Sequence, residues 1–226
     1  MSDLDLNVSD WEETKCFFYN GNKSSIPFDI FAASFFMLSR YEEYLPHVQD
    51  VHERFSATES LAYKKRFLEK PVVDIWAYKF LEVLKEKFPN YEYVEREFKF
   101  ISTIDVDIAY SYKNKGIIRT VGGFFNDFVH FRFGNIWHRL LTILNFWQDP
   151  FDTYSEILKM KKEFKISTIF FFLVGDYTTF DKNISSSNNK FKSLVKSVAD
   201  YAKVGLHPSY YSHKDVDLLK KEKLRL

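Results

Sequence analysis

The sequence predicts an α/β protein in which parallel strands alternate with helices, and three observations support this class. First, 46% of the 226 residues are hydrophobic, which is enough to bury a core. Second, beyond about residue 96, short apolar runs alternate with segments of helical periodicity. Third, the residues before about 96 lack this alternation, and their apolar residues recur at helical spacing. Strand, helix and strand in succession imply crossover connections and therefore a parallel sheet.

Residues 1–95 are expected to form a separate, smaller, α-rich domain. Apolar residues recur at helical spacing over 27–44, which predicts a mostly buried helix there. A second helix is predicted at 72–88, with Pro89 as its stop. Residues 41–69 mix charged and aromatic side chains without clear periodicity and are expected to be irregular.

Residues 96–226 are expected to hold the alternating strands and helices. Asp152 is the expected N-cap of one of these helices, and His213 the expected start of the last. The segment 116–134 is Gly-containing and aromatic, and no helix is assigned to it. Strands are predicted at 101–107, 167–174 and 204–207, and helices at 136–147, 152–164, 191–203 and 214–226.

Charge and cysteine content disfavour several classes of protein. The 32 basic residues nearly balance the 31 acidic ones, which argues against a dedicated nucleic-acid or anionic-membrane binder. Cys16 is the single cysteine, so an intrachain disulfide and a thiolate zinc cluster are excluded and a reducing compartment is expected. The start of the chain lacks a secretory pattern, and the most apolar run, 166–175, has about half the ~20 residues that a membrane span needs. A cytoplasmic protein without a membrane span is therefore expected.

Aromatic residues make up 19% of the chain. They could form a surface on which carbohydrate stacks. A Phe-rich core is favoured, because large aromatic side chains usually bury.

The candidate chemistry lies at the carboxyl ends of the predicted strands, where parallel α/β proteins collect their reactive side chains. Asp105 and Asp107 close the first strand, Asp176 follows the second and His207 closes the third. Carboxylates two residues apart point to the same side and can share cation binding and proton acceptance. His207 could add a neutral imidazole to the same cation. Taken alone, such aspartates more often cap a helix or tie a turn, and a turn is the favoured role of Asp176.

A resemblance to a known family appears at the first strand end, where residues 103–107 read Thr-Ile-Asp-Val-Asp. This segment resembles the Thr-Phe-Asp-Asp signature of the polysaccharide deacetylases (NodB homology, carbohydrate esterase family four). Residues 205–211, Gly-Leu-His-Pro-Ser-Tyr-Tyr, resemble the later His-(Ser/Thr)-x-x-His motif of that family. Residues 27–44 are similar to a segment of the extra N-terminal domain found in a bacterial branch typical of Bacteroidetes.

The resemblance implies a distorted (β/α) barrel, of which this chain holds the early strands and within which it ends. It implies that Asp105 is the general base and that Asp107 and His207 are ligands of a divalent metal, which could be zinc, cobalt or nickel. The implied reaction is the removal of N-acetyl groups from an amino sugar or polysaccharide, with that acetylated carbohydrate as the partner. Two positions depart from the family pattern: Val106 separates the two aspartates, and Tyr211 stands where the second His is expected. A third ligand is therefore expected from further along the chain, and this segment alone is expected to be inactive.

Two other functions stay open. One is a non-catalytic carbohydrate-binding or scaffolding protein that keeps the barrel and has lost part of the metal triad, which Val106 and Tyr211 favour. The other is a cytosolic hydrolase with the same site and a small acetylated or formylated substrate. The residues do not select the substrate, the metal or the oligomeric state.

Overall fold

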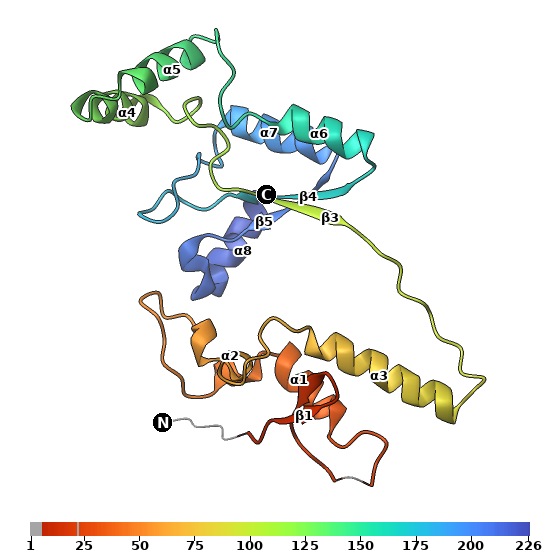
Figure 1. Ribbon diagram of the computed structural model, residues 1–226. Helices are drawn as coiled ribbons and strands as arrows, with labels where there is room; N and C mark the ends of the chain where they lie inside the picture. Colours follow the sequence, from red (N-terminus) through yellow and green to blue (C-terminus); the bar gives the residue numbers. More distant parts are fainter. Residues whose placement is uncertain (1–5, 22) are drawn as a thin grey trace. The chain divides into compact units, whose positions relative to one another are not determined.

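The computed structural model describes residues 6–21 and 23–226 and is mixed α/β (Figure 1). The chain divides into two compact units, Met1–Arg96 and Glu97–Leu226. In the part of the chain that the structure describes, no helix combines the length and the apolar character that a bilayer crossing requires.

The N-terminal unit begins with a short antiparallel hairpin that the sequence analysis did not predict. Strand β1 (Ser9–Trp11) pairs with β2 (Thr14–Cys16), and Glu12 in the turn has the left-handed φ of 53°. Strands of three residues are too short to show the apolar alternation that identifies a strand. The unit is therefore not purely helical.

The helix expected at 27–44 is shorter than predicted. Helix α1 (Ile30–Leu38) begins after Asp29, whose side chain accepts hydrogen bonds from two backbone N–H groups of the first turn. Arg40 adopts a left-handed φ of 52°, which ends the α-helical ladder, and the chain continues as the 3-10 helix η1 (Tyr41–Tyr44). The expectation of a mostly buried helix was also wrong, because Phe31 and Phe35 are 70% and 63% exposed.

The second predicted helix is confirmed as α3 (Val72–Lys87). The region between α1 and α3 contains the short helical turns η1, η2 (Ala57–Glu59) and α2 (Leu61–Lys64) and one antiparallel bridge between Gln49 and Phe55. The core of the unit surrounds Trp76 of α3, which is fully buried. Its indole N–H donates to the carbonyl oxygen of Lys15 at 2.9 Å, which ties α3 to β2.

The C-terminal unit is built on three parallel strands in the order β3-β4-β5, which confirms the predicted parallel sheet. They are β3 (Ile101–Val106), β4 (Ser167–Leu173) and β5 (Lys203–His207). One face of the sheet, which carries Phe170 and Phe172 in its centre, packs against α6 and α7 (Figure 1). Among the described residues no further strand pairs with β3 or β5, so no closed barrel is formed.

Several predicted helix ends in this unit were wrong. A helix, α4, occupies the segment left unassigned, whose Gly122 and Gly123 weaken the helical pattern. Asp152 does not cap α6, which begins after Thr153, and His213 ends the 3-10 helix η3 and does not begin α8, whose N-cap is Asp215. The helical segments are α4 (Ile117–Val129), α5 (Phe133–Ile143), α6 (Tyr154–Glu163), α7 (Asn189–Ala199), η3 (Tyr210–His213) and α8 (Val216–Arg225).

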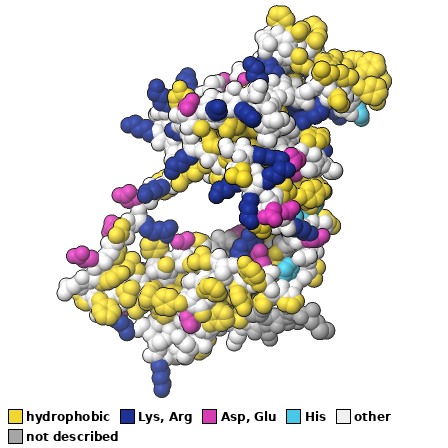
Figure 2. Space-filling model, turned by 180° about the vertical axis from the view of Figure 1, so that it is seen from behind, with side chains coloured by type: hydrophobic (Ala, Val, Ile, Leu, Met, Phe, Trp, Pro, Cys, Tyr) yellow, Lys and Arg dark blue, Asp and Glu magenta, His cyan; other side chains and the backbone are white. Residues whose placement is uncertain are grey.

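The expectation that aromatic residues build the core holds only in part. Buried phenylalanines do occupy the centre of both units. Many other large apolar side chains lie on the surface, as the space-filling view in Figure 2 shows. Nine of these exposed side chains belong to the neighbouring helices α4 and α5.

Candidate metal and catalytic site

The sheet places the three predicted site residues on one face. Asp105 lies opposite Phe171 of β4, which in turn lies opposite Gly205, and His207 lies opposite Leu173. Because side chains alternate along each strand and paired residues of neighbouring strands share a face, Asp105, Asp107 and His207 point to the same side. That side, here called the second face, is opposite to the one that packs on α6 and α7.

The structure brings Asp107 and His207 together across β4. The Oδ1 atom of Asp107 lies 3.3 Å from Nε2 of His207, and the other ring nitrogen of His207 lies 3.1 Å from the carbonyl oxygen of Pro208. With the proton on Nδ1 donated to that carbonyl, Nε2 keeps its lone pair, as histidine ligands of metals require. Neither side chain is buried, with 64% of Asp107 and 32% of His207 exposed.

The separation of these two atoms suits two ligands of one metal ion. Oxygen and nitrogen ligands lie about 2.0–2.1 Å from zinc, so two of them in tetrahedral geometry are about 3.3 Å apart. Aspartate oxygen and imidazole nitrogen are also ligand types that zinc, cobalt and nickel accept. Within residues 6–21 and 23–226, however, no group of three or more His, Cys, Asp or Glu side chains is placed to hold a metal. The pair therefore fits two positions of a coordination sphere.

Asp105 stands apart from this pair but on the same face. Its side chain is exposed and lines a pocket of about 370 Å³ that also contacts Asp107. The pocket runs along β3 and reaches Phe151 and Tyr154, near the start of α6. Asp105 is thus an exposed carboxylate on the same face as the Asp107 and His207 pair, where a water molecule can reach it.

The close approach of β5 to β4 depends on Gly205. A Cβ atom added there would lie 2.7 Å from the ring of Phe171, closer than side chains tolerate. The ring of Phe171 therefore lies against the backbone of β5, between Asp105 and Gly205 in the register. This packing sets the position of β5, and so of His207, relative to β3.

Asp176 is not part of the site. Its carboxylate pairs with Arg225 at 2.8 Å and with Lys221 at 3.8 Å, and both of these residues belong to α8. It therefore ties the segment after β4 to α8.

Tyr211 occupies the position at which the resemblance expects a second His ligand. It is 47% exposed and belongs to η3, four residues after His207. Its ring packs against Tyr210, with ring centroids 5.2 Å apart, and Tyr210 stacks on Phe180 at 4.0 Å. We call Phe180, Tyr210 and Tyr211 the aromatic cluster.

Two buried aspartates that sequence reasoning missed position the loops around the site. Asp181 accepts hydrogen bonds from the backbone N–H of Tyr210 at 3.1 and 3.2 Å, which joins the loop after β4 to η3. Asp149 accepts from the backbone N–H groups of three consecutive residues of the loop after β3, beginning with Ser111 at 2.6 Å. Burial raises the pKa of the Asp149 carboxyl, but these hydrogen bonds outweigh burial, so its pKa lies below the usual value. It therefore stays ionised at neutral pH and holds the loop that follows Asp107.

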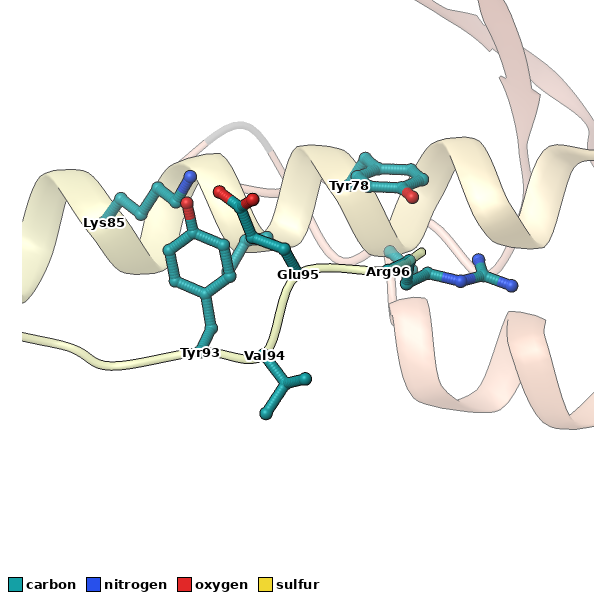
Figure 3. A pocket seen from close by; sticks show the side chains of 8 residues that line it. Tyr78, Lys85, Tyr93, Val94, Glu95 and Arg96 are labelled. Carbon is teal, nitrogen blue, oxygen red and sulfur yellow. The ribbon is translucent and has the colours of Figure 1, made fainter. Parts of the chain in front are cut away.

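The N-terminal unit has a separate pocket of about 450 Å³ between α3 and the extended chain that follows it (Figure 3). The ammonium group of Lys85 lies 4.0 Å from the centre of the Tyr93 ring, and Arg96 pairs with Asp74 at 2.7 Å. None of the predicted site residues lines this pocket. Its contacts hold the extended chain against α3.

Comparison with known proteins relates the N-terminal part of the chain to a family. A model of a family of unknown function (DUF7033) matches residues 1–89, which run from the N-terminus to the end of α3. The matched segment therefore lies within the N-terminal unit, and that unit is similar to this family. No curated protein and no solved structure matches the chain. The fold and the site thus define a class, an α/β protein with carboxylates and an imidazole at the ends of parallel strands.

Proposed function

We propose that the protein is a metal-dependent hydrolase that removes N-acetyl groups from an amino sugar or polysaccharide. In this proposal Asp107 and His207 bind a divalent metal, and Asp105 is the general base. The observation that carries it is the 3.3 Å separation of Asp107 Oδ1 and His207 Nε2 on the face that also bears Asp105. The sequence resemblance to polysaccharide deacetylases supplies the reaction class.

The chemistry follows from the roles of the side chains. A divalent metal at Asp107 and His207 would polarise the acetamide carbonyl and make a bound water more acidic. The Asp105 carboxylate accepts a proton from the attacking water and then donates it to the amine nitrogen, on which the carbon–nitrogen bond breaks. The products are acetate and a free amino sugar. The metal could be zinc, cobalt or nickel, because all three accept mixed oxygen and nitrogen ligands.

The arrangement of the sheet supports a barrel of the NodB type. In (β/α) barrels the helices cover the outside, while the strand ends carry the catalytic residues. Here α6 and α7 cover one face, and Asp105, Asp107 and His207 lie on the other. We propose that β3, β4 and β5 are consecutive strands of such a barrel wall.

The aromatic cluster supports carbohydrate as the substrate class. Phe180 and Tyr211 are 51% and 47% exposed, and they lie in the segments that follow β4 and β5. Aromatic faces beside a site can pack against the apolar face of a sugar ring. The same cluster suits the second candidate, a non-catalytic carbohydrate-binding protein, which Tyr211 in the place of a His ligand favours.

Acetate release separates the two candidates. The longest natural polypeptide that contains this chain would be loaded with zinc and incubated with N-acetylglucosamine oligomers. We expect acetate and free amine to appear in equal amounts, and a chelator to abolish both. Binding of the oligomers without acetate release, in protein that holds stoichiometric metal, would overturn the hydrolase and leave the binding protein.

A further inference from the structure

We propose that the helical hairpin formed by α4 and α5 docks on the surface of an anionic lipid bilayer. The inference is independent of the proposed hydrolase function. It rests on the apolar side chains that the hairpin exposes, on the buried ion pair between its helices and on the sign of its charges.

The hairpin exposes an unusual amount of apolar surface. The exposed fractions range from 37% for Leu140 to 88% for Ile118, and together these side chains expose on the order of 1,000 Å². Exposed apolar patches beyond a few hundred Å² mark interaction sites. The exposed residues of the hairpin and of the segment directly after it are Ile117, Ile118, Val121, Phe125, Phe128, Val129, Phe131, Phe133, Trp137, Leu140, Leu144, Phe146 and Trp147.

These side chains form a stripe along each helix. On α4 the exposed positions 117, 121, 125 and 128 recur at the helical period, and on α5 the positions 133, 137 and 140 do the same, with exposed Leu144 at its C-cap. Figure 2 shows hydrophobic side chains gathered over this hairpin, which lies at the upper right of that view. The apolar stripes therefore face outward.

A buried ion pair joins the two helices. Arg139 of α5 donates to Asp127 of α4, with Nη2 and Oδ2 2.7 Å apart, and the two side chains are only 12% and 6% exposed. Gly123 makes room for this contact, since a Cβ atom there would lie 2.4 Å from the Arg139 guanidinium. A helical pair that faces water places its apolar side inward and its charges outward. In this hairpin a charged pair lies between the helices and apolar stripes lie on the outside, an arrangement that suits apolar surroundings.

The charges of the hairpin favour an anionic surface. Between Ile117 and Gln148 the sequence has a single carboxylate, Asp127, and the pair with Arg139 buries it. Arg132, in the turn that connects α4 to α5, is exposed and cationic. The balanced charge of the whole chain therefore does not describe this part of the surface. Cationic groups beside exposed Phe and Trp side chains are typical of segments that lie in the interface of anionic membranes.

The length of the helices decides how the hairpin would lie. The 13 residues of α4 extend about 20 Å, which is shorter than the ~30 Å hydrocarbon core. The helices cannot cross the bilayer and would lie along its surface, with the two apolar stripes in the interface.

Flotation with lipid vesicles tests this proposal. The whole chain is mixed with vesicles of phosphatidylcholine alone or with added phosphatidylglycerol. We expect flotation with the anionic vesicles and weaker flotation with the neutral ones. The triple variant Phe125→Ser, Phe128→Ser and Trp137→Ser should bind about a hundredfold more weakly, because less apolar surface leaves water. Arg132→Glu should weaken binding to anionic vesicles about tenfold and binding to neutral vesicles little.

A matched triple variant provides the control. Val94→Ser, Phe98→Ser and Phe164→Ser removes exposed apolar side chains from outside the hairpin and should leave flotation unchanged. Circular dichroism checks that each variant is folded, and the Arg132→Glu variant keeps the test decisive if the triple variant does not fold. Absence of wild-type flotation with both vesicles, or equal flotation of the hairpin variant, would overturn the proposal. A second result would also overturn it. In that result light scattering shows the wild type as a dimer and the hairpin variant as a monomer, and the wild type does not float with vesicles.

Discussion

The variant Asp105→Asn is expected to release acetate about 100 to 10,000 times more slowly than the wild type, which is the usual range for loss of a general base. Asparagine keeps the shape of the side chain but cannot accept a proton. Asp105 lies on the same face as Asp107 and His207 but is not part of their 3.3 Å contact, so the metal affinity should change little. The measurement is kcat with saturating acetylated oligomer and zinc, in the longest natural polypeptide that contains this chain, together with a zinc titration of the same variant.

Asp176→Asn is the matched control for this prediction. Asp176 also follows a strand of the parallel sheet, but it pairs with Arg225 and Lys221 of α8. Its replacement should therefore leave kcat within about twofold of the wild type, since it lies outside the reacting groups. A kcat for Asp105→Asn within about tenfold of the wild type would remove Asp105 from the role of base.

The second large effect is expected in the N-terminal unit, where Trp76→Ala should lower the free energy of unfolding by about 3–5 kcal/mol. Trp76 is fully buried, and its ring meets Phe17 and Phe28 edge to face, with ring centroids 5.6 and 5.3 Å apart. Alanine would leave a large cavity and an unpaired carbonyl oxygen on Lys15, which now accepts the indole N–H. Urea unfolding of the wild type and of Trp76→Ala, monitored by circular dichroism, measures the change in the free energy of unfolding.

Two further variants, in α3 and directly after it, give losses of stability with which the effect of Trp76→Ala can be compared. Trp76→Phe keeps most of the volume and loses the hydrogen bond, so we expect a smaller loss than for alanine. Phe88→Ala, at the end of α3, removes a side chain that is 59% exposed and should cost less than about 1 kcal/mol. A loss below about 1 kcal/mol for Trp76→Ala would show that this residue is not the centre of the core.

Much of the fold followed from local sequence patterns, and the errors have identifiable causes. Helix α3 was predicted closely because its apolar period is regular and Pro89 follows it. The helix before it was predicted too long, because the aromatic pattern continues through Tyr41 although the left-handed Arg40 ends α1. Helix α4 was missed because its exposed apolar residues and central glycines do not resemble the helix of a soluble protein.

The candidate site was predictable in its residues but not in its contacts. Strand ends in a parallel sheet are expected to carry reactive groups, which indicated Asp105, Asp107, Asp176 and His207, and the family resemblance assigned roles to Asp105, Asp107 and His207. Their placement on one face follows from the register, which depends on packing such as that of Phe171 on Gly205. The role of Asp149 was not predictable, because its partner Ser111 is 38 residues away in sequence. Such hydrogen bonds depend on tertiary structure and leave no local pattern.

Zinc titration by calorimetry tests most directly the central claim, that Asp107 and His207 form a metal site. For this chain we predict one zinc ion per molecule, with affinity reduced about a hundredfold or more in Asp107→Ala and in His207→Ala, because each loses one of two ligands. Asp176→Ala, the control, should bind zinc as the wild type does. Absence of zinc binding, or binding that both variants retain at wild-type affinity, would contradict the claim.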